Sequence, residues 1–210
     1  MSERELRERI ALHGRSLFER GLTGGSSGNI SVRLPDGLLV TPTNSCLGRL
    51  DPERITKLSE SGDVIAGDKP SKEAFLHKSF YNSRPNERAV VHLHSTHSVA
   101  ISCLADVDKD DVLPPLTPYY VMRVGRLPLL PYFAPGDEEL AEAVATAAIQ
   151  SRSLLLANHG PVVAGKDLDS AVNAIEELEE TAKLYLMLRR EKTRCLNEAE
   201  VALLKAKFPS

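Results

Sequence analysis

The sequence predicts an α/β protein in which helices flank a mixed β-sheet. Three observations support this fold class. Strand-like segments, with alternating or continuously apolar side chains, occur along the whole chain. Some of them follow one another through tight turns, whereas others alternate with helix-like segments. The 210 residues are 42% apolar and 26% charged and contain no repeat or linker, which favours a single domain over residues 1–210.

The first part of the chain predicts one helix followed by strand pairs. Residues 3–20 carry apolar side chains at helical spacing, and this amphipathic helix is expected to end at Gly21. The glycine- and serine-rich residues that follow, up to Asn29, predict an irregular loop. Two strands are expected at residues 30–34 and 38–41, joined by a Pro-Asp-Gly turn, and another hairpin is expected around residues 59–63.

The rest of the chain alternates between helix-like and strand-like segments. The predicted helices cover residues 71–81, 95–103, 137–150, 167–191 and 197–207. The predicted strands cover residues 89–94, 127–130, 153–157 and 161–164, and the second of these lies in a proline-rich stretch, residues 106–135. Ser71 is expected to cap the first of these helices.

The composition excludes several classes of function. The net charge of −3, from 26 basic and 29 acidic residues, gives no indication of a nucleic-acid partner. No apolar run is long enough to span a membrane, and no apolar segment of a signal peptide follows the charged N-terminus. Cys46, Cys103 and Cys195 are far apart and form no CxxC pair, so we expect free thiols and a cytoplasmic location.

The most informative segment is Ala-Val-Val-His-Leu-His at residues 89–94. Alternate residues of a strand face the same side, so His92 and His94 point together with Cα atoms roughly 7 Å apart. That distance suits two ligands of one metal ion. From this pair alone, the alternative that one histidine packs in the core while the other faces solvent stays open.

Two further groups could complete a metal site. His159 follows an apolar strand in Asn-His-Gly, and Glu73 lies in Pro-Ser-Lys-Glu at the start of a predicted helix. Each also has a structural interpretation, because a glutamate complements a helix dipole and a loop imidazole can bond to backbone. Three imidazoles and a carboxylate suit Zn²⁺, and such ligands also accept Mn²⁺, Fe²⁺ or Co²⁺. His77, four residues after Glu73, is expected to pack beside the site rather than to bind the metal.

Three segments predict binding of an anion. The glycine-rich loop before Asn29 exposes backbone N–H groups, although it matches neither the P-loop nor the dinucleotide-binding fingerprint. Residues 41–45, Thr-Pro-Thr-Asn-Ser, add hydroxyl and amide groups. Ser71 and Lys72 precede a helix, where anions bind favourably. Around one metal ion, these segments indicate a small phosphorylated or carboxylated substrate.

Together these motifs resemble the class II aldolase/adducin family over nearly the whole chain. The motifs are Gly28-Asn29-Ile30-Ser31, Thr41-Pro42-Thr43, Pro70-Ser71-Lys72-Glu73, His92-Leu93-His94 and Asn158-His159-Gly160. The resemblance implies a three-layer α/β/α sandwich with a central mixed, largely antiparallel sheet. It also implies a homotetramer with zinc sites near the subunit interfaces.

The resemblance also implies roles for individual residues. His92, His94 and His159 match zinc ligands of the family, and Glu73 matches a glutamate that binds zinc at rest and acts as acid/base during turnover. The positions of the substrate phosphate pocket correspond to Gly28, Asn29, Thr43, Asn44, Ser71 and Lys72. Tyr119 matches a catalytic tyrosine that reaches a neighbouring subunit's site, with the adjacent Tyr120 as the alternative.

The chain departs from the aldolases of the family at three positions. Lys72 stands where they have serine, Asn44 where they have glycine, and Asn158 where they tend to have a second histidine. The chain is more similar to the branch that decarboxylates 3-oxo-tetronate 4-phosphate. The implied reaction is zinc-dependent and yields dihydroxyacetone phosphate and CO₂ through a metal-stabilised enediolate. We expect Glu73 to return a proton to C2 and Lys72 to bind the phosphate.

Two other functions remain as alternatives. One is an aldolase or epimerase acting on a sugar phosphate such as fuculose 1-phosphate or ribulose 5-phosphate. The other is a non-catalytic interaction module, as in the adducin head. The presence of Glu73 and all three histidines argues against the second alternative, since a scaffold does not need an open metal site.

Overall fold

The computed structural model describes residues 1–134 and 137–208 and contains a central sheet of eight strands. The strand order is β4-β3-β2-β1-β5-β8-β7-β6. Their bounds are β1 (Asn29–Leu34), β2 (Gly37–Val40), β3 (Thr56–Leu58), β4 (Val64–Ala66), β5 (Ala89–His92), β6 (Leu129–Leu130), β7 (Ser153–Leu156) and β8 (Gly160–Gly165). The β6–β7 pair is parallel and the other neighbouring pairs are antiparallel, so the predicted mixed, largely antiparallel sheet is confirmed.

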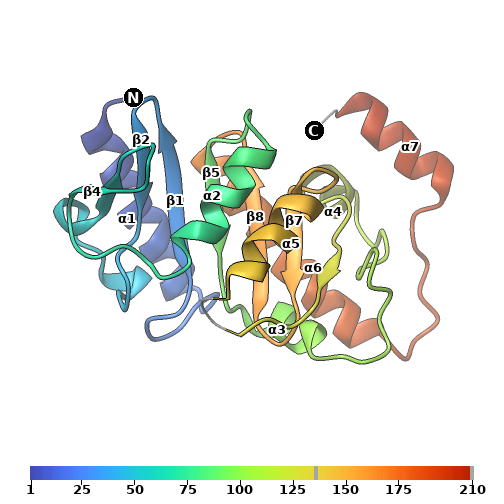
Figure 1. Ribbon diagram of the computed structural model, residues 1–210. Helices are drawn as coiled ribbons and strands as arrows, with labels where there is room; N and C mark the ends of the chain where they lie inside the picture. The colour runs from blue at the N-terminus through green and yellow to red at the C-terminus, as the bar shows by residue number, and fades with distance from the viewer. Residues whose placement is uncertain (135–136, 209–210) are drawn as a thin grey trace.

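Seven α-helices and two short 3-10 helices, Leu47–Arg49 and Pro52–Arg54, accompany the sheet within the described residues. The α-helices are α1 (Glu3–Glu19), α2 (Ala74–Ser83), α3 (Thr96–Ser102), α4 (Pro118–Arg123), α5 (Glu138–Ala148), α6 (Leu168–Leu188) and α7 (Glu198–Lys207). Figure 1 views the sheet from the side that α2 and α5 cover. None of these helices is long and apolar enough to cross a membrane.

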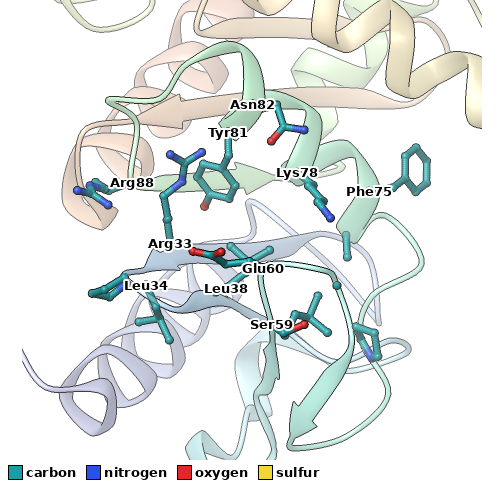
Figure 2. A pocket seen from close by; sticks show the side chains of 16 residues that line it. Arg33, Leu34, Leu38, Ser59, Glu60, Phe75, Lys78, Tyr81, Asn82 and Arg88 are labelled. Atoms are coloured by element: carbon teal, nitrogen blue, oxygen red, sulfur yellow. The ribbon is translucent and has the colours of Figure 1, made fainter.

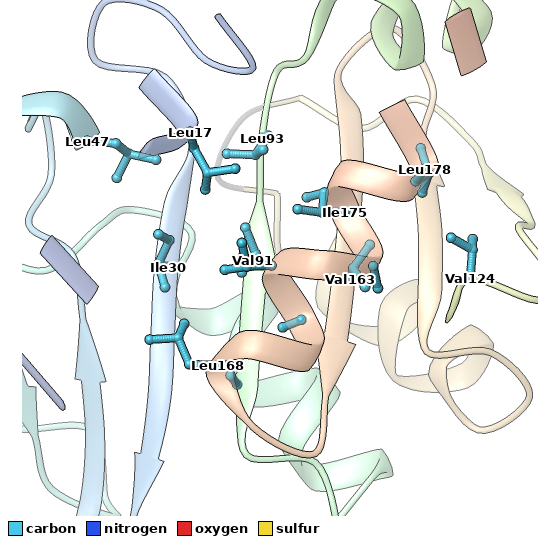
Figure 3. Close-up of a cluster of buried hydrophobic side chains, with 14 of the residues drawn as sticks. Leu17, Ile30, Leu47, Val91, Leu93, Val124, Val163, Leu168, Ile175 and Leu178 are labelled. Atoms are coloured by element: carbon cyan, nitrogen blue, oxygen red, sulfur yellow. The ribbon is translucent and has the colours of Figure 1, made fainter. Parts of the chain in front are cut away.

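Side chains of alternate strand residues enter two separate hydrophobic cores. Val91 of β5 lies in the core that α1, α3, α4 and α6 cover, where it packs among side chains such as Ile175 (Figure 3). Val90, its neighbour in the strand, lies in the core that α2 and α5 cover, together with Phe80 and Val144. Neighbouring strand residues point to opposite faces, so a strand buried on both sides places helices on both faces. The predicted three-layer α/β/α arrangement is therefore confirmed.

Several elements differ from the prediction at their ends. The helix expected from residue 71 begins at Ala74, because the Ser71 amide donates to the Thr41 carbonyl (3.2 Å) and remains in the loop. The expected cap is thus wrong, although the Ser71 hydroxyl accepts a bond from the Glu73 amide (3.2 Å). The strand expected over 89–94 ends at His92, because β1 begins opposite it, at Asn29.

The proline-rich stretch contains the one α-helix of the described residues that the sequence pattern did not predict. Helix α4 begins at Pro118, whose fixed φ suits the first helical turn, and the Thr117 hydroxyl accepts a bond from the Tyr120 amide. The strand expected at 127–130 is limited to the two residues of β6. Pro135, the last residue of the stretch, and residues 209–210 of the predicted domain lie outside the described residues.

Candidate active site

The four candidate metal-site residues come from three parts of the chain that meet at one end of β5. His92 is the last residue of β5, and His94 follows it by two residues. His159 lies in the turn between β7 and β8, and β8 pairs with β5. Glu73 immediately precedes α2. The structure therefore brings together all four residues that the sequence indicated.

The three imidazoles are close enough to share one metal ion. Their possible ligand nitrogens lie within 4.8 Å of one another, and the ring centroids are 4.7–4.9 Å apart. The Nε2 atoms of His92 and His94 are 3.1 Å apart. Two nitrogens bound to one tetrahedral zinc ion lie about 3.3 Å apart. The donor set and its spacing thus fit a divalent metal ion.

The tautomer of His92 also suits a metal ligand. Its Nδ1–H donates to the carbonyl oxygen of Pro161 at 2.9 Å, which leaves the lone pair of Nε2 facing the other histidines. His92 is fully buried, and this burial lowers its pKa to about 4 despite the nearby charge of Glu73. His92 is therefore neutral near pH 7, the form that binds a metal ion.

The carboxylate of Glu73 faces the same cluster. Oε1 lies 3.2 Å from Nε2 of His159, Oε2 lies 3.5 Å from Nε2 of His92, and Oε2 accepts a hydrogen bond from the Asn29 amide at 2.6 Å. Burial alone would raise the pKa of Glu73. Hydrogen bonds from His159 and Asn29, with favourable electrostatic interactions with His92 and His159, outweigh this effect and hold the pKa far below its ordinary value. Glu73 is thus ionised and available as a fourth ligand.

Two glycines allow the surrounding loops to approach β5. Gly28 has φ +79°, and a Cβ there would lie 2.9 Å from the carbonyl oxygen of His92. Gly160 has φ +153°, and a Cβ there would lie 2.4 Å from the carbonyl oxygen of Leu93. Asn158 adopts a left-handed conformation with φ 56°, which asparagine tolerates better than most residues. The position of His159 thus depends on unusual backbone conformations on both sides.

The three predicted anion-binding segments meet beside Glu73. The Thr43 amide donates to the Lys69 carbonyl at 2.9 Å, and Pro42 and Pro70 form an isolated β-bridge. The Thr41 hydroxyl accepts a bond from the Ile30 amide at 3.1 Å, which connects this loop to β1. The predicted phosphate-pocket residues therefore share one region of the molecule.

A cavity of about 330 Å³ adjoins these segments. Thr43, Asn44 and Gly25 line it, together with Arg49 and Arg54. The sequence analysis assigned no role to either arginine, although Arg49 closely follows the hydroxyl-rich segment 41–45. Arg54 forms an ion pair with Asp68.

Lys72 and Tyr119 are both at the surface. Lys72 is exposed and directly precedes Glu73 in the chain. Tyr119 is 55% exposed, and the guanidinium of Arg123 lies over its ring, 5.1 Å from the centroid. Tyr120 is 2% exposed and lies in the core. Of the two tyrosines, Tyr119 is therefore the one exposed at the surface.

The sequence analysis missed one carboxylate that supports the site. Glu179 of α6 accepts bonds from the backbone amides of His97 and Ser98, both at 2.9 Å, and from the Ser98 hydroxyl at 2.7 Å. It thereby holds the start of α3, just after His94. Because Glu179 is more than 80 residues away in the sequence, spacing gave no signal for this contact.

Another cavity, of about 750 Å³, lies away from the histidines (Figure 2). Its lining includes Arg33, Arg88, Lys78 and Tyr81, and none of the four candidate metal-site residues. The Arg33 guanidinium lies 4.7 Å from the centre of the Tyr81 ring. This cavity is therefore distinct from the candidate active site.

The fold and the site together define an α/β/α protein with a metal-binding cluster of three histidines and an adjacent carboxylate at the end of a central strand. The family model for the class II aldolase and adducin N-terminal domain matches residues 8–186. The chain therefore belongs to the class II aldolase and adducin family.

Several known proteins are similar to this chain over nearly its whole length. The 3-oxo-tetronate 4-phosphate decarboxylase of Pectobacterium atrosepticum is 52% identical over 97% of this chain and 94% of its own length. The L-fuculose phosphate aldolase of Haemophilus influenzae is 35% identical over 90% of this chain and 85% of its own length. The crystal structure of YgbL from Escherichia coli has a TM-score of 0.94 and 49% identity, covering 97% of this chain and 99% of that one.

Proposed function

We propose that this chain is a zinc-dependent carboxy-lyase that converts 3-oxo-tetronate 4-phosphate into dihydroxyacetone phosphate and CO₂. The observation that carries the proposal is the 52% identity, over nearly the full length of both chains, to a decarboxylase named for this substrate. The assembled cluster of Glu73, His92, His94 and His159 supports an enzyme rather than an interaction module.

In this proposal, His92, His94 and His159 hold the metal ion and Glu73 is a further ligand at rest. When bound, a divalent cation supplies Lewis-acid stabilisation of the negative charge that develops on the substrate during C–C cleavage. We expect Zn²⁺ because the donor set is rich in nitrogen. The affinities of the protein for Mn²⁺, Fe²⁺ and Co²⁺ should be measured for comparison with that for Zn²⁺.

Loss of CO₂ breaks the C1–C2 bond of the substrate and leaves its electron pair with C2 and the adjacent ketone. The product then needs one proton at C2, and we assign its delivery to Glu73. Glu73 is ionised in the resting site, because hydrogen bonds and neighbouring charges stabilise its carboxylate. Each turnover therefore requires Glu73 to take up one proton from solvent, which it then delivers to C2.

The phosphate is proposed to bind at the segments that meet beside Glu73, which include Thr43, Asn44, Ser71 and Lys72. We assign Lys72 to the phosphate rather than to the carboxylate, because a tight hold on the carboxylate would stabilise the ground state and slow its loss as CO₂. Changing Lys72→Ser is expected to raise KM for the phosphorylated acid more than it lowers kcat. An unchanged KM would remove Lys72 from the phosphate site.

We further propose a cytoplasmic homotetramer in which Tyr119 reaches the active site of a neighbouring subunit. The exposure of Tyr119, in contrast to the buried Tyr120, supports this arrangement. Sedimentation would report the assembly directly. Tyr119→Phe is expected to lower kcat while leaving the sedimentation coefficient unchanged.

The deciding experiment is a substrate panel with the zinc-loaded protein. The panel contains 3-oxo-tetronate 4-phosphates of both C2 configurations, fuculose 1-phosphate and ribulose 5-phosphate, and both dihydroxyacetone phosphate and CO₂ are measured. Decarboxylation predicts equal amounts of the two products from a 3-oxo-tetronate 4-phosphate. The 35% identity to a fuculose phosphate aldolase supports aldol cleavage as the second candidate, which yields no CO₂. Folded, metal-loaded protein that releases no CO₂ from either configuration would contradict the proposal.

A further inference from the structure

A buried chain of hydrogen bonds leads from Glu73 into the protein. The Asn29 amide nitrogen donates to Glu73 Oε2 at 2.6 Å, and Asn29 Oδ1 lies 2.5 Å from His77 Nε2. His77 Nδ1 lies 2.6 Å from the Ser31 hydroxyl, which lies 2.8 Å from the Tyr81 hydroxyl. His77 and Ser31 are fully buried, and Asn29 and Tyr81 are each 4% exposed.

We propose that His77 is a positioning residue that orients the Asn29 amide toward Glu73, through a chain of hydrogen bonds in which every donor points toward the carboxylate. The part of this inference that concerns catalysis rests on the proposed function. The orientation of the chain itself does not, because it follows from the contacts, the charge of Glu73 and the neutral state of His77.

The chemistry of the five groups allows one direction. An ionised carboxylate can only accept, so the NH₂ group of Asn29 must face Glu73 and its Oδ1 must face His77. Oδ1 also only accepts, so His77 must carry its proton on Nε2. Burial lowers the pKa of His77 to about 3, so the ring is neutral near pH 7 and its Nδ1 is an acceptor. Ser31 then donates to Nδ1, and Tyr81 donates to Ser31.

Reversal of any member places two acceptors or two donors in contact. If His77 carried its proton on Nδ1, the lone pair of Nε2 would face Asn29 Oδ1 at 2.5 Å. A flip of the Asn29 amide would relieve that contact and place Oδ1 against the Glu73 carboxylate. The tautomer of His77 and the orientation of Asn29 are therefore coupled, and the charge of Glu73 selects both.

This coupling gives His77 an influence on the reaction without contact to the reacting atoms. Asn29 begins β1 opposite His92 and holds Glu73 Oε2 on the side of the histidines. Loss of the bond from His77 frees the Asn29 amide to rotate, so that Glu73 loses a donor that holds its orientation. The step that depends on Glu73 should then slow, whereas Thr43, Asn44, Ser71 and Lys72, the other residues assigned to the phosphate, keep their positions.

Two substitutions at residue 77 separate this role from packing. The amide nitrogen of glutamine reaches the position of Nε2, so His77→Gln keeps a donor to Asn29. Asparagine is shorter and reaches only the position of Nδ1, so His77→Asn keeps a partner for Ser31 and loses the donor to Asn29. With zinc-loaded protein, kcat should fall less than about threefold in the glutamine variant and more than about tenfold in the asparagine variant, with KM changed less. Equal activity of the two variants would overturn the inference.

The tautomer can be measured without any enzymatic assay. In zinc-loaded protein labelled with ¹⁵N-histidine, long-range ¹H–¹⁵N spectra distinguish protonated from unprotonated ring nitrogens, and the signals missing from His77→Gln identify His77. We expect a neutral ring protonated on Nε2, and a proton on Nδ1 would overturn the proposed orientation even if the Asn variant does not fold. A wild-type protein that releases no CO₂ but shows the Nε2–H tautomer would reject the proposed function and leave the orientation standing.

Discussion

The stability of the metal-free protein should depend on pH through His77, and His77→Gln isolates this dependence. Burial, followed by the charge of His92, lowers the pKa of His77 from 6.5 to about 3. Between these values the unfolded chain binds a proton at residue 77 and the folded chain does not, so the free energy of unfolding increases with pH. The contribution of neutral His77 to the free energy of unfolding is fully present above pH 6.5 and is lost as the pH falls toward 3. Between pH 7.5 and pH 5, wild type should lose about 2 kcal/mol from His77.

Urea unfolding of the chelated proteins measures this difference. Wild type and His77→Gln are compared at pH 7.5, 6 and 5 and at one protein concentration, because the apparent stability of an oligomer depends on concentration. The other histidines are present in both proteins, so the difference between the two profiles reports His77 and its coupling to His92. The free energy of unfolding of His77→Gln should fall less steeply than that of wild type, by about 1.2 kcal/mol between pH 6 and pH 5. Parallel pH profiles would refute the reasoning and indicate that His77 is accessible to protons in the folded state.

Three further substitutions test the site. His94→Ala should weaken zinc binding, which is measured by competition with a chelator. Removal of a residue that only hydrogen-bonds to a metal ligand lowers metal affinity roughly 10–100-fold, and loss of the ligand His94 itself should lower it further. Activity should be lost in parallel, and retention of one zinc ion per chain would contradict the assignment. Glu73→Gln should lower the rate of CO₂ release by about 10²–10⁴-fold while the protein still folds, and full activity would exclude the acid/base role. Gly160→Ala places a Cβ against the Leu93 carbonyl oxygen at a φ that alanine rarely adopts. The free energy of unfolding in urea should therefore fall by about 1–3 kcal/mol. An unchanged free energy of unfolding would show that the turn relaxes around the new side chain.

The sequence predicted the parts of the site that lie within short motifs. The two-residue spacing of His92 and His94 was sufficient to indicate that they point together, although β5 ends at His92 and His94 lies just beyond it. The position of His159 after an apolar strand was sufficient to bring it to the same end of the sheet, because β8 is a neighbour of both β5 and β7.

The remaining parts depend on contacts between distant segments. Ser71 was expected to cap a helix, but its amide bonds to Thr41, and a sequence pattern cannot show this competition. The bonds from His97 and Ser98 to Glu179 require that α3 and α6 lie together, which follows from the packing of the whole layer. Helix α4 was missed because a proline-rich segment usually indicates a loop.

Because Asn29 pairs with His92, assembly of the site depends on the correct register between β1 and β5. A shift of one residue between β1 and β5 would turn the inward side chains of one strand to the opposite face of the sheet. Asn29 and Glu73 would then no longer meet beside the histidines. A metal ion that binds the assembled cluster favours the native register over its neighbours, by a free energy that increases with metal concentration. Availability of the metal in the cell would then influence the yield of folded protein as well as its activity.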